Sequence, residues 1–130
     1  MQITFNLNSE SDPIEKLCSI AEELLNNADK KQYTQAIVLY TNNNIGCGVL
    51  IENALSEDKS DEKSLFDLML SKNDTKVNSL ICVWHDGCID LPSYSFRKML
   101  LELNPENEEA KIVFPKENGW FSRSVKSTMK

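Results

Sequence analysis

The segment "NSLICVWHDGCIDLPSYSFRKML", residues 78–100, contains the units that decide the fold: a buried strand, a turn and an amphipathic helix. The apolar run at the end of the strand is typical of a strand covered on both faces, and "HDG" indicates the turn after it. The helix then presents an apolar stripe made of Phe96, Met99, Leu100 and Leu103. Catalytic groups often lie at the start of such a helix. Here the polar residues at the start of the helix are two serines, a tyrosine and an arginine, and none of these is a strong metal ligand.

The sequence on either side of this segment predicts an alternation of strands and helices. The expected elements are an edge strand at residues 1–7, a helix at 11–28, two strands around an Asn-rich turn within 34–54, a helix at 60–72 and a strand at 110–115. Residues 118–130 have an ambiguous pattern, and one interpretation is a short helix docked through Trp120, Phe121 and Val125. This order favours a layered α/β domain in which helices cover a mixed sheet.

Composition predicts one globular domain spanning residues 1–130, because 41% of the 130 residues are hydrophobic and 26% are charged. The N-terminus lacks the basic-then-apolar pattern of a signal peptide, and the apolar runs are shorter than a membrane span. We therefore expect a cytoplasmic protein without membrane contact, whose four cysteines are reduced thiols. Cys18 lies in the apolar stripe of its helix, which predicts a core position.

The charge is acidic and uneven. Residues 1–110 hold 19 acidic and 9 basic side chains, a net charge of −10, and residues 111–130 hold 1 acidic and 5 basic side chains, a net charge of +4. An acidic body repels phosphate backbones, which disfavours direct nucleic-acid binding. It suits a basic protein partner better.

Two segments carry a resemblance to a known family. "YTQAIVLY" (33–40) and "GVLIENA" (48–54) resemble the Tyr-Ser-x-Phe-x-Val strand and the Gly-x-Asn-x-Glu-Asn-Ala segment of cytidine deaminases, and the similarity runs over about residues 12–115. The resemblance implies a three-layer α/β/α fold with a mixed sheet, to which the strand at 1–7 is an addition and residues 116–130 a short basic tail. Glu52 matches the ribose-binding glutamate. Ala36 and Leu50 replace the family's substrate-contacting aromatic residue and asparagine.

The two zinc-binding motifs of that family are also recognisable, but they are altered. The His/Cys-x-Glu motif becomes Ser60-Asp61-Glu62, and Pro-Cys-x-x-Cys becomes "PSYSF", residues 92–96, followed by a matching Arg97. Ser60, Ser93 and Phe96 thus stand at the three ligand positions, where zinc needs soft or borderline donors. The resemblance therefore implies no metal, no cofactor and no deamination, and makes Glu52, Glu62 and Arg97 vestigial.

Helix electrostatics offer another reason for the acids of the first motif, because negative charge is favourable in the first turn of any helix. By the same reasoning from position, Glu52 is an ordinary carboxylate at a strand end. Arg97 is either a surface residue or a partner for one of the two glutamates.

A replacement metal site is suggested by the spacing of Cys82, His85 and Cys88. However, side chains three apart on a strand point to opposite faces of the sheet, so the ligands would converge only at a sharp bend. We expect a buried Cys82 and a His85 in the turn instead.

Two functional hypotheses remain open. The first is a non-catalytic deaminase-fold protein that binds another protein, as an immunity or antitoxin protein neutralising a basic nuclease-type toxin, since opposite fields speed association. The second is a divergent cytidine or nucleoside deaminase, or a nucleoside-binding protein, that uses Glu52, Glu62 and Arg97. The residues expected to contact a basic partner are acids on helix faces and loops: Glu22, Glu23, Glu57, Asp58, Glu106, Glu108 and Glu109.

Overall fold

The computed structural model describes residues 2–6, 13–27, 32–42 and 45–129. Its elements in chain order are β1 (Gln2–Asn6), α1 (Pro13–Asn26), β2 (Gln35–Thr41), β3 (Ile45–Ile51), α2 (Ser60–Ser71), β4 (Val77–Trp84), α3 (Tyr94–Leu103), the 3-10 helix η1 (Pro105–Glu109), β5 (Lys111–Lys116), β6 (Gly119–Ser124) and the 3-10 helix η2 (Lys126–Thr128). In the described part of the chain, no helix is long and apolar enough to cross a membrane.

The strands form one mixed sheet in the order β1-β3-β2-β4-β5-β6. The β4–β5 pair is parallel, and the other neighbouring pairs are antiparallel. The predicted α/β architecture and the extra edge strand β1 are confirmed. Residues 1 and 7 of that predicted strand, 11, 12 and 28 of the predicted helix, and 43–44 of the Asn-rich turn lie outside the described residues.

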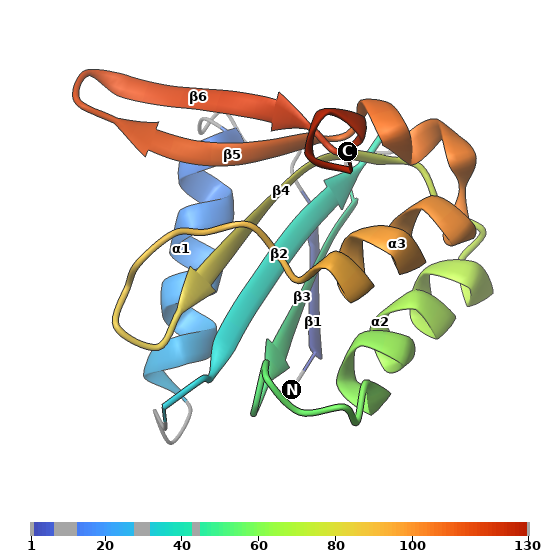
Figure 1. Ribbon diagram of the computed structural model, residues 1–130, viewed down its shortest axis with the longest axis horizontal. Helices are drawn as coiled ribbons and strands as arrows, with labels where there is room; N and C mark the ends of the chain where they lie inside the picture. The colour runs from blue at the N-terminus through green and yellow to red at the C-terminus, as the bar shows by residue number, and fades with distance from the viewer. Residues whose placement is uncertain (1, 7–12, 28–31, 43–44, 130) are drawn as a thin grey trace.

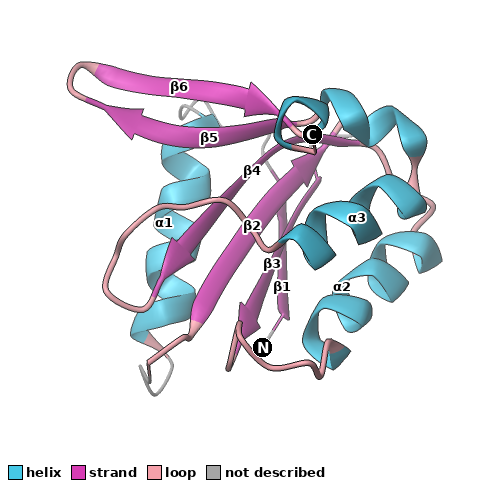
Figure 2. Cartoon of the chain, in the orientation of Figure 1, coloured by secondary structure: helices cyan, strands magenta, loops and turns pink. Residues whose placement is uncertain are grey.

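The sheet is covered on both faces, which makes three layers (Figures 1 and 2). Side chains alternate along a strand, so β2 and β4 each supply two sets of core residues. One set, including Ala36, Val38, Ile81 and Val83, packs under α1. The other set, including Ile37, Leu39, Leu80 and Cys82, packs under α2 and α3. This double coverage explains the continuous apolar runs of the two central strands.

The C-terminal residues differ from the prediction. Residues 119–124 form β6, and the expected helix is reduced to the single turn η2 after Val125. β6 pairs with β5 over six register positions, and the Phe114 and Phe121 rings stack at 5.2 Å between centroids. Val125 is buried, and its N–H donates to the carbonyl of Ala110. Residues 119–124 of the expected basic tail are therefore part of the sheet. Their polar, short sequence gave no clear strand period, and pairing with β5 decides their structure.

One buried amide organises the connection from α3 to β5. Asn107 of η1 is fully buried; its Oδ1 accepts from the Val77 N–H at 2.7 Å, and its Nδ2 donates to the carbonyls of Thr75 and Leu100, both at 3.0 Å. The side chain thus satisfies three backbone groups that would otherwise be buried without partners. This fixes the start of β4 to the end of α3.

Candidate functional site

The start of α3 contains Ser93 and Phe96, two of the three residues that the sequence resemblance aligns with zinc ligands. The hydroxyl of Ser93 accepts a hydrogen bond from the Phe96 N–H at 3.1 Å and caps the helix. The Phe96 side chain is 1% exposed, and its ring centroid lies 5.1 Å from that of Phe66 on α2. At these positions the serine therefore serves as a helix cap, and the phenylalanine joins α2 to α3 within the core.

The start of α2 holds the third position and the matching glutamate. Ser60 is exposed, and its N–H donates to Asp58. Glu62 is buried, with Oε2 at 3.7 Å from the Lys59 ammonium, while Oε1 has no hydrogen-bond partner among the described residues. Burial raises the pKa of Glu62 above its ordinary value, and its own backbone N–H and Lys59 oppose this only in part.

These residues do not fit a zinc ion. Catalytic zinc sites use thiolate, imidazole or carboxylate donors and keep one coordination position open. Here one hydroxyl is engaged as a cap, and a phenyl ring that has no donor atom fills the core. Within the described ranges, no group of three or more His, Cys, Asp or Glu side chains is placed to hold a metal ion.

Arg97 has a different role from those expected for it. Its Nε donates to the carbonyl of Pro92 at 3.0 Å, and its Nη1 donates to the carbonyl of Thr128 at 2.7 Å. The guanidinium also lies 5.9 Å from the ring centroid of the exposed Tyr94. Arg97 therefore ties the start of α3 to η2 at the C-terminus, instead of pairing with Glu52 or Glu62.

The remaining positions of the resemblance lie at and within the central hairpin. Ala36 and Leu50 face each other in the register of β2 and β3, and both are buried in the core under α1. Glu52 follows β3 and is exposed; its backbone N–H donates to Asp61 and its carbonyl accepts from Thr34. Ala36 and Leu50 thus serve the core between the sheet and α1.

Cys82 of the possible replacement site lies apart from the other two groups. It is buried under α2 and α3, whereas His85 and the exposed Cys88 both line a hollow beside the start of β2. Burial raises the pKa of Cys82, and the neighbouring Asp86 raises that of Cys88. Cys18 is half-buried against the core under α1, and burial together with Glu22 and Glu15 raises its pKa to about 11. All four cysteines are free thiols. Because their pKa values are raised, Cys18, Cys82 and Cys88 are not activated nucleophiles.

The seven acids expected at an interface are all exposed, but they lie on three separate segments. Glu22 and Glu23 lie on α1, Glu57 and Asp58 precede α2, and the other three lie on η1. Two of the η1 acids have basic partners: Glu106 lies 3.9 Å from Lys76, and Glu109 lies 2.7 Å from Lys126. The η1 group therefore contributes less unpaired negative charge than its sequence suggests.

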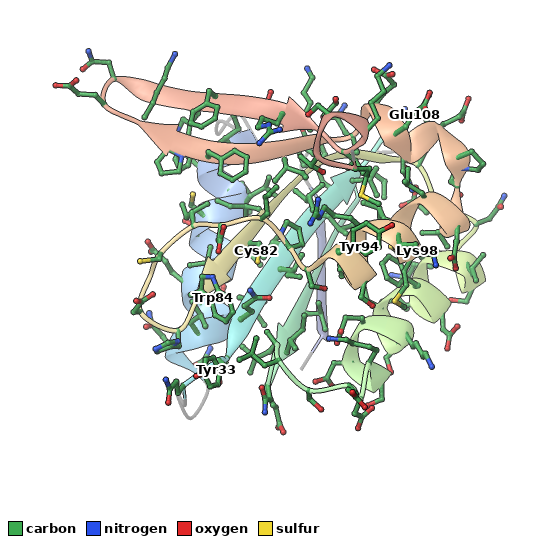
Figure 3. All side chains as sticks on the ribbon, viewed as in Figure 1. Tyr33, Cys82, Trp84, Tyr94, Lys98 and Glu108 are labelled. Atoms are coloured by element: carbon green, nitrogen blue, oxygen red, sulfur yellow. The ribbon has the colours of Figure 1, made fainter. Side chains whose placement is uncertain are left out.

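Sequence reasoning missed the loop between β4 and α3 as a surface feature. This loop borders two hollows of about 370 Å³ each, one beside α1 and one beside the start of β2. The second is lined by Tyr33 and Trp84 together with Asp86 and Asp90. Figure 3 shows Tyr33 and Trp84 at the same end of the sheet, opposite to the end that carries Glu108. Tyr33 lies far from Trp84, Asp86 and Asp90 in the sequence, so their convergence depends on the β2–β4 pairing.

No protein-family profile and no curated protein sequence matches the chain. Among solved structures, a cytidine deaminase from Mycobacterium leprae is similar with a TM-score of 0.65 and 18% identity, over 92% of this chain and 98% of that one. A mutant cytidine deaminase from Mycobacterium tuberculosis is similar with a TM-score of 0.65 and 14% identity, over 91% and 95% of the two chains. The chain therefore has the cytidine deaminase fold. Sequence identities of 14–18% establish the fold alone.

Proposed function

We propose that this chain is a non-catalytic protein of deaminase fold that acts by binding a basic protein, as an immunity or antitoxin protein that neutralises a nuclease-type toxin. The carrying observation is the start of α3, where the Phe96 ring packs against Phe66 and Ser93 is a helix cap. A deaminase that depends on zinc needs donors at these positions. Here one position is a helix cap and the other is filled by a core ring, which supports a use of the fold without metal-dependent chemistry.

The charge supports a basic partner in particular. The chain carries a net charge of −6, and exposed acids lie on α1, on η1 and before α2. Complementary charge raises the association rate of two proteins and disfavours wrong partners. A nuclease that binds a phosphate backbone presents a basic surface, which an acidic protein of this size is suited to cover.

The proposal is tested by screening the proteins encoded beside the gene for a basic one that stops growth of the host, and then producing it together with the chain. We expect the chain to restore growth, and the purified pair to associate more slowly as salt is raised. A matched culture that produces the toxic protein alone sets the baseline. Failure to neutralise it, or affinity capture that returns nucleotides or nucleic acid alone, contradicts the proposal.

A divergent deaminase or nucleoside-binding protein is the second candidate, and one observation favours it. Glu62 occupies the place of the family's proton-shuttling glutamate, is buried, and has one oxygen without a partner among the described residues. Incubating the purified chain with cytidine, with Glu62→Gln as control, separates the two candidates. Uridine formed by the natural chain and lost in Glu62→Gln, or one zinc per chain by elemental analysis, supports the second candidate over the first.

A further inference from the structure

The loop between β4 and α3 is held rigidly by its own hydrogen bonds. The Trp84 N–H donates to the carbonyl of Cys88 at 2.8 Å, and the Gly87 N–H donates to the carbonyl of Trp84 at 2.9 Å. Gly87 has φ +91°, a conformation that favours glycine. The carboxylate of Asp90 accepts from the Trp84 indole at 3.1 Å, which fixes the orientation of the ring. Trp84 is thus a preorganised aromatic surface.

The hollow beside this loop combines aromatic and acidic groups. Tyr33 and Trp84 supply its rings, and the exposed Asp86 and Asp90 supply its carboxylates. Among the described residues that line it there is no lysine or arginine. A hydrogen bond from the Cys88 N–H lowers the pKa of Asp86, so this carboxylate is charged at neutral pH. Aromatic faces and carboxylates both attract cations, while they repel phosphate.

Tyr33 is held in an unfavourable backbone conformation. Its φ is +73°, which is uncommon for a bulky aromatic residue, and its side chain is 38% exposed. The carbonyl of Tyr33 accepts from the Ala54 N–H at 2.8 Å, which helps to hold the backbone in place. Asparagine or glycine would adopt this conformation with less strain. Strain of this kind in an exposed residue favours a role in binding over a role in stability.

The hollow beside α1 extends the same surface. It shares His85 and Asp86 with the hollow that Tyr33 and Trp84 line, and it adds Glu22, one of the acids expected at the interface. Asp86 therefore lies between two hollows. One also contains Glu22 of α1, and the other also contains Asp90 of the loop. Neither the η1 acids nor those before α2 line this surface.

We propose that the hollow formed by Tyr33, Trp84, Asp86 and Asp90 binds a lysine or arginine side chain on the surface of a basic partner protein. The proposal rests on the proposed function and names the surface that carries it out. The ring of Trp84 offers a cation–π contact, and Asp86 offers an ion pair to the same cationic group. The neighbouring hollow with Glu22 accepts a second basic side chain of the partner.

The test is a nuclear magnetic resonance titration of the ¹⁵N-labelled chain with N-acetyl-arginine amide, N-acetyl-lysine amide and the uncharged N-acetyl-citrulline amide. The chain has two tryptophans, Trp84 and Trp120, so its indole N–H signals provide a reporter and an internal reference. We expect saturable shifts of the Trp84 indole signal with at least one cationic amide. The citrulline amide and the Trp120 signal should show no such response.

Variants identify the groups responsible. Tyr33→Asn removes the ring and relieves the backbone, so it keeps the fold and weakens cation binding about five- to thirty-fold, whereas Tyr33→Phe retains binding. Asp86→Asn keeps an acceptor for the Cys88 N–H but removes the charge, and it weakens binding by a similar factor. Asp67→Asn, an equal charge change on the exposed face of α2, leaves binding unchanged.

The proposal is overturned if neither cationic amide gives a saturable shift, if citrulline amide titrates as well, or if Asp67→Asn weakens binding as much as Asp86→Asn. Shifts of the Trp84 signal with protein concentration alone assign the hollow to a second copy of the chain and also overturn it. Successful titration without neutralisation of any toxic protein refutes the proposed function but not the cation site. Neutralisation without cation binding refutes the hollow alone.

Discussion

Two single residues at the start of α3 have clear structural roles: Ser93 is a helix cap, and the Phe96 ring is packed against Phe66 in the core. The sequence identified both residues but not the contact of Phe96 with Phe66, because that contact depends on where α2 lies against α3.

We expect Phe96→Ala to lower the free energy of unfolding by about 3–5 kcal/mol, the usual cost of truncating a buried aromatic residue. Phe96→Leu keeps most of the volume and should cost clearly less. Urea denaturation of the three proteins measures both values. Equal stability of Phe96→Ala and the natural chain would show that the ring is not a core element.

The burial of Glu62 gives a pH-dependent prediction. Because its folded pKa is raised, Glu62 favours folding when protonated; this contribution is complete below the ordinary value of 4.5 and is lost as pH rises through the folded pKa. At pH 7 we therefore expect Glu62→Gln to have a Tm equal to or above that of the natural chain. The difference should shrink as pH falls toward 4.5. A Tm advantage that grows on acidification contradicts this sign.

Glu62 also shows a limit of reasoning from sequence. The helix dipole favours a glutamate in the first turn, so the position of Glu62 in the sequence does not reveal whether its side chain faces water or the core. Only the packing of α2 against the sheet decides that this side chain is buried. The sequence thus located the residue and the helix, but not its environment.

At the scale of elements, the sequence predicted most strands and helices but not β6. The central strands have continuous apolar runs that identify them without their neighbours. β6, in contrast, has the mostly exposed sequence "GWFSRS" and is defined by six register pairs with β5. A strand whose period is masked by polar residues on both faces is recognisable only through its partner.

The link between α3 and the C-terminus is testable through Arg97. Arg97→Ala removes the donors to the carbonyls of Pro92 and Thr128, and we expect it to cost roughly 1–3 kcal/mol of stability. Lys98→Ala changes the next, exposed side chain of α3 and serves as control, with an expected effect within about 0.5 kcal/mol. Thermal unfolding compares them. Equal effects of the two variants would exclude a specific clamp.

At the scale of the whole molecule, the order of the elements was enough to predict a mixed sheet between two helical layers. The distribution of charge over the surface was not predictable to the same extent. Lys76 and Lys126 lie close to two η1 acids only because of the fold. The sequence could therefore count the acids, but it could not choose which of them attract a partner.

Charge reversal separates these surfaces. With the purified toxic partner, we expect Glu22→Lys to slow association several-fold at low salt, and this effect to fade as salt shortens the Debye length below about 10 Å. Glu108→Lys makes the same charge change at the opposite end of the sheet from Tyr33 and Trp84, and it should slow association less (Figure 3). Stopped-flow kinetics measures both. Equal slowing would indicate attraction by net charge without a preferred surface.

The parallel joint between β4 and β5 has a consequence for local opening. Within the described residues these strands pair at two register positions, Ser79 with Lys111 and Leu80 with Ile112, and the β5–β6 hairpin then extends away from β4 (Figure 1). A ladder this short adds few backbone hydrogen bonds between β4 and β5, so we expect the two strands to open separately. We expect amide protons of β5 and β6 to exchange with solvent through a shared opening that leaves β2, β3 and β4 intact. Native-state hydrogen exchange should therefore divide this continuous sheet into two protection classes at the β4–β5 joint.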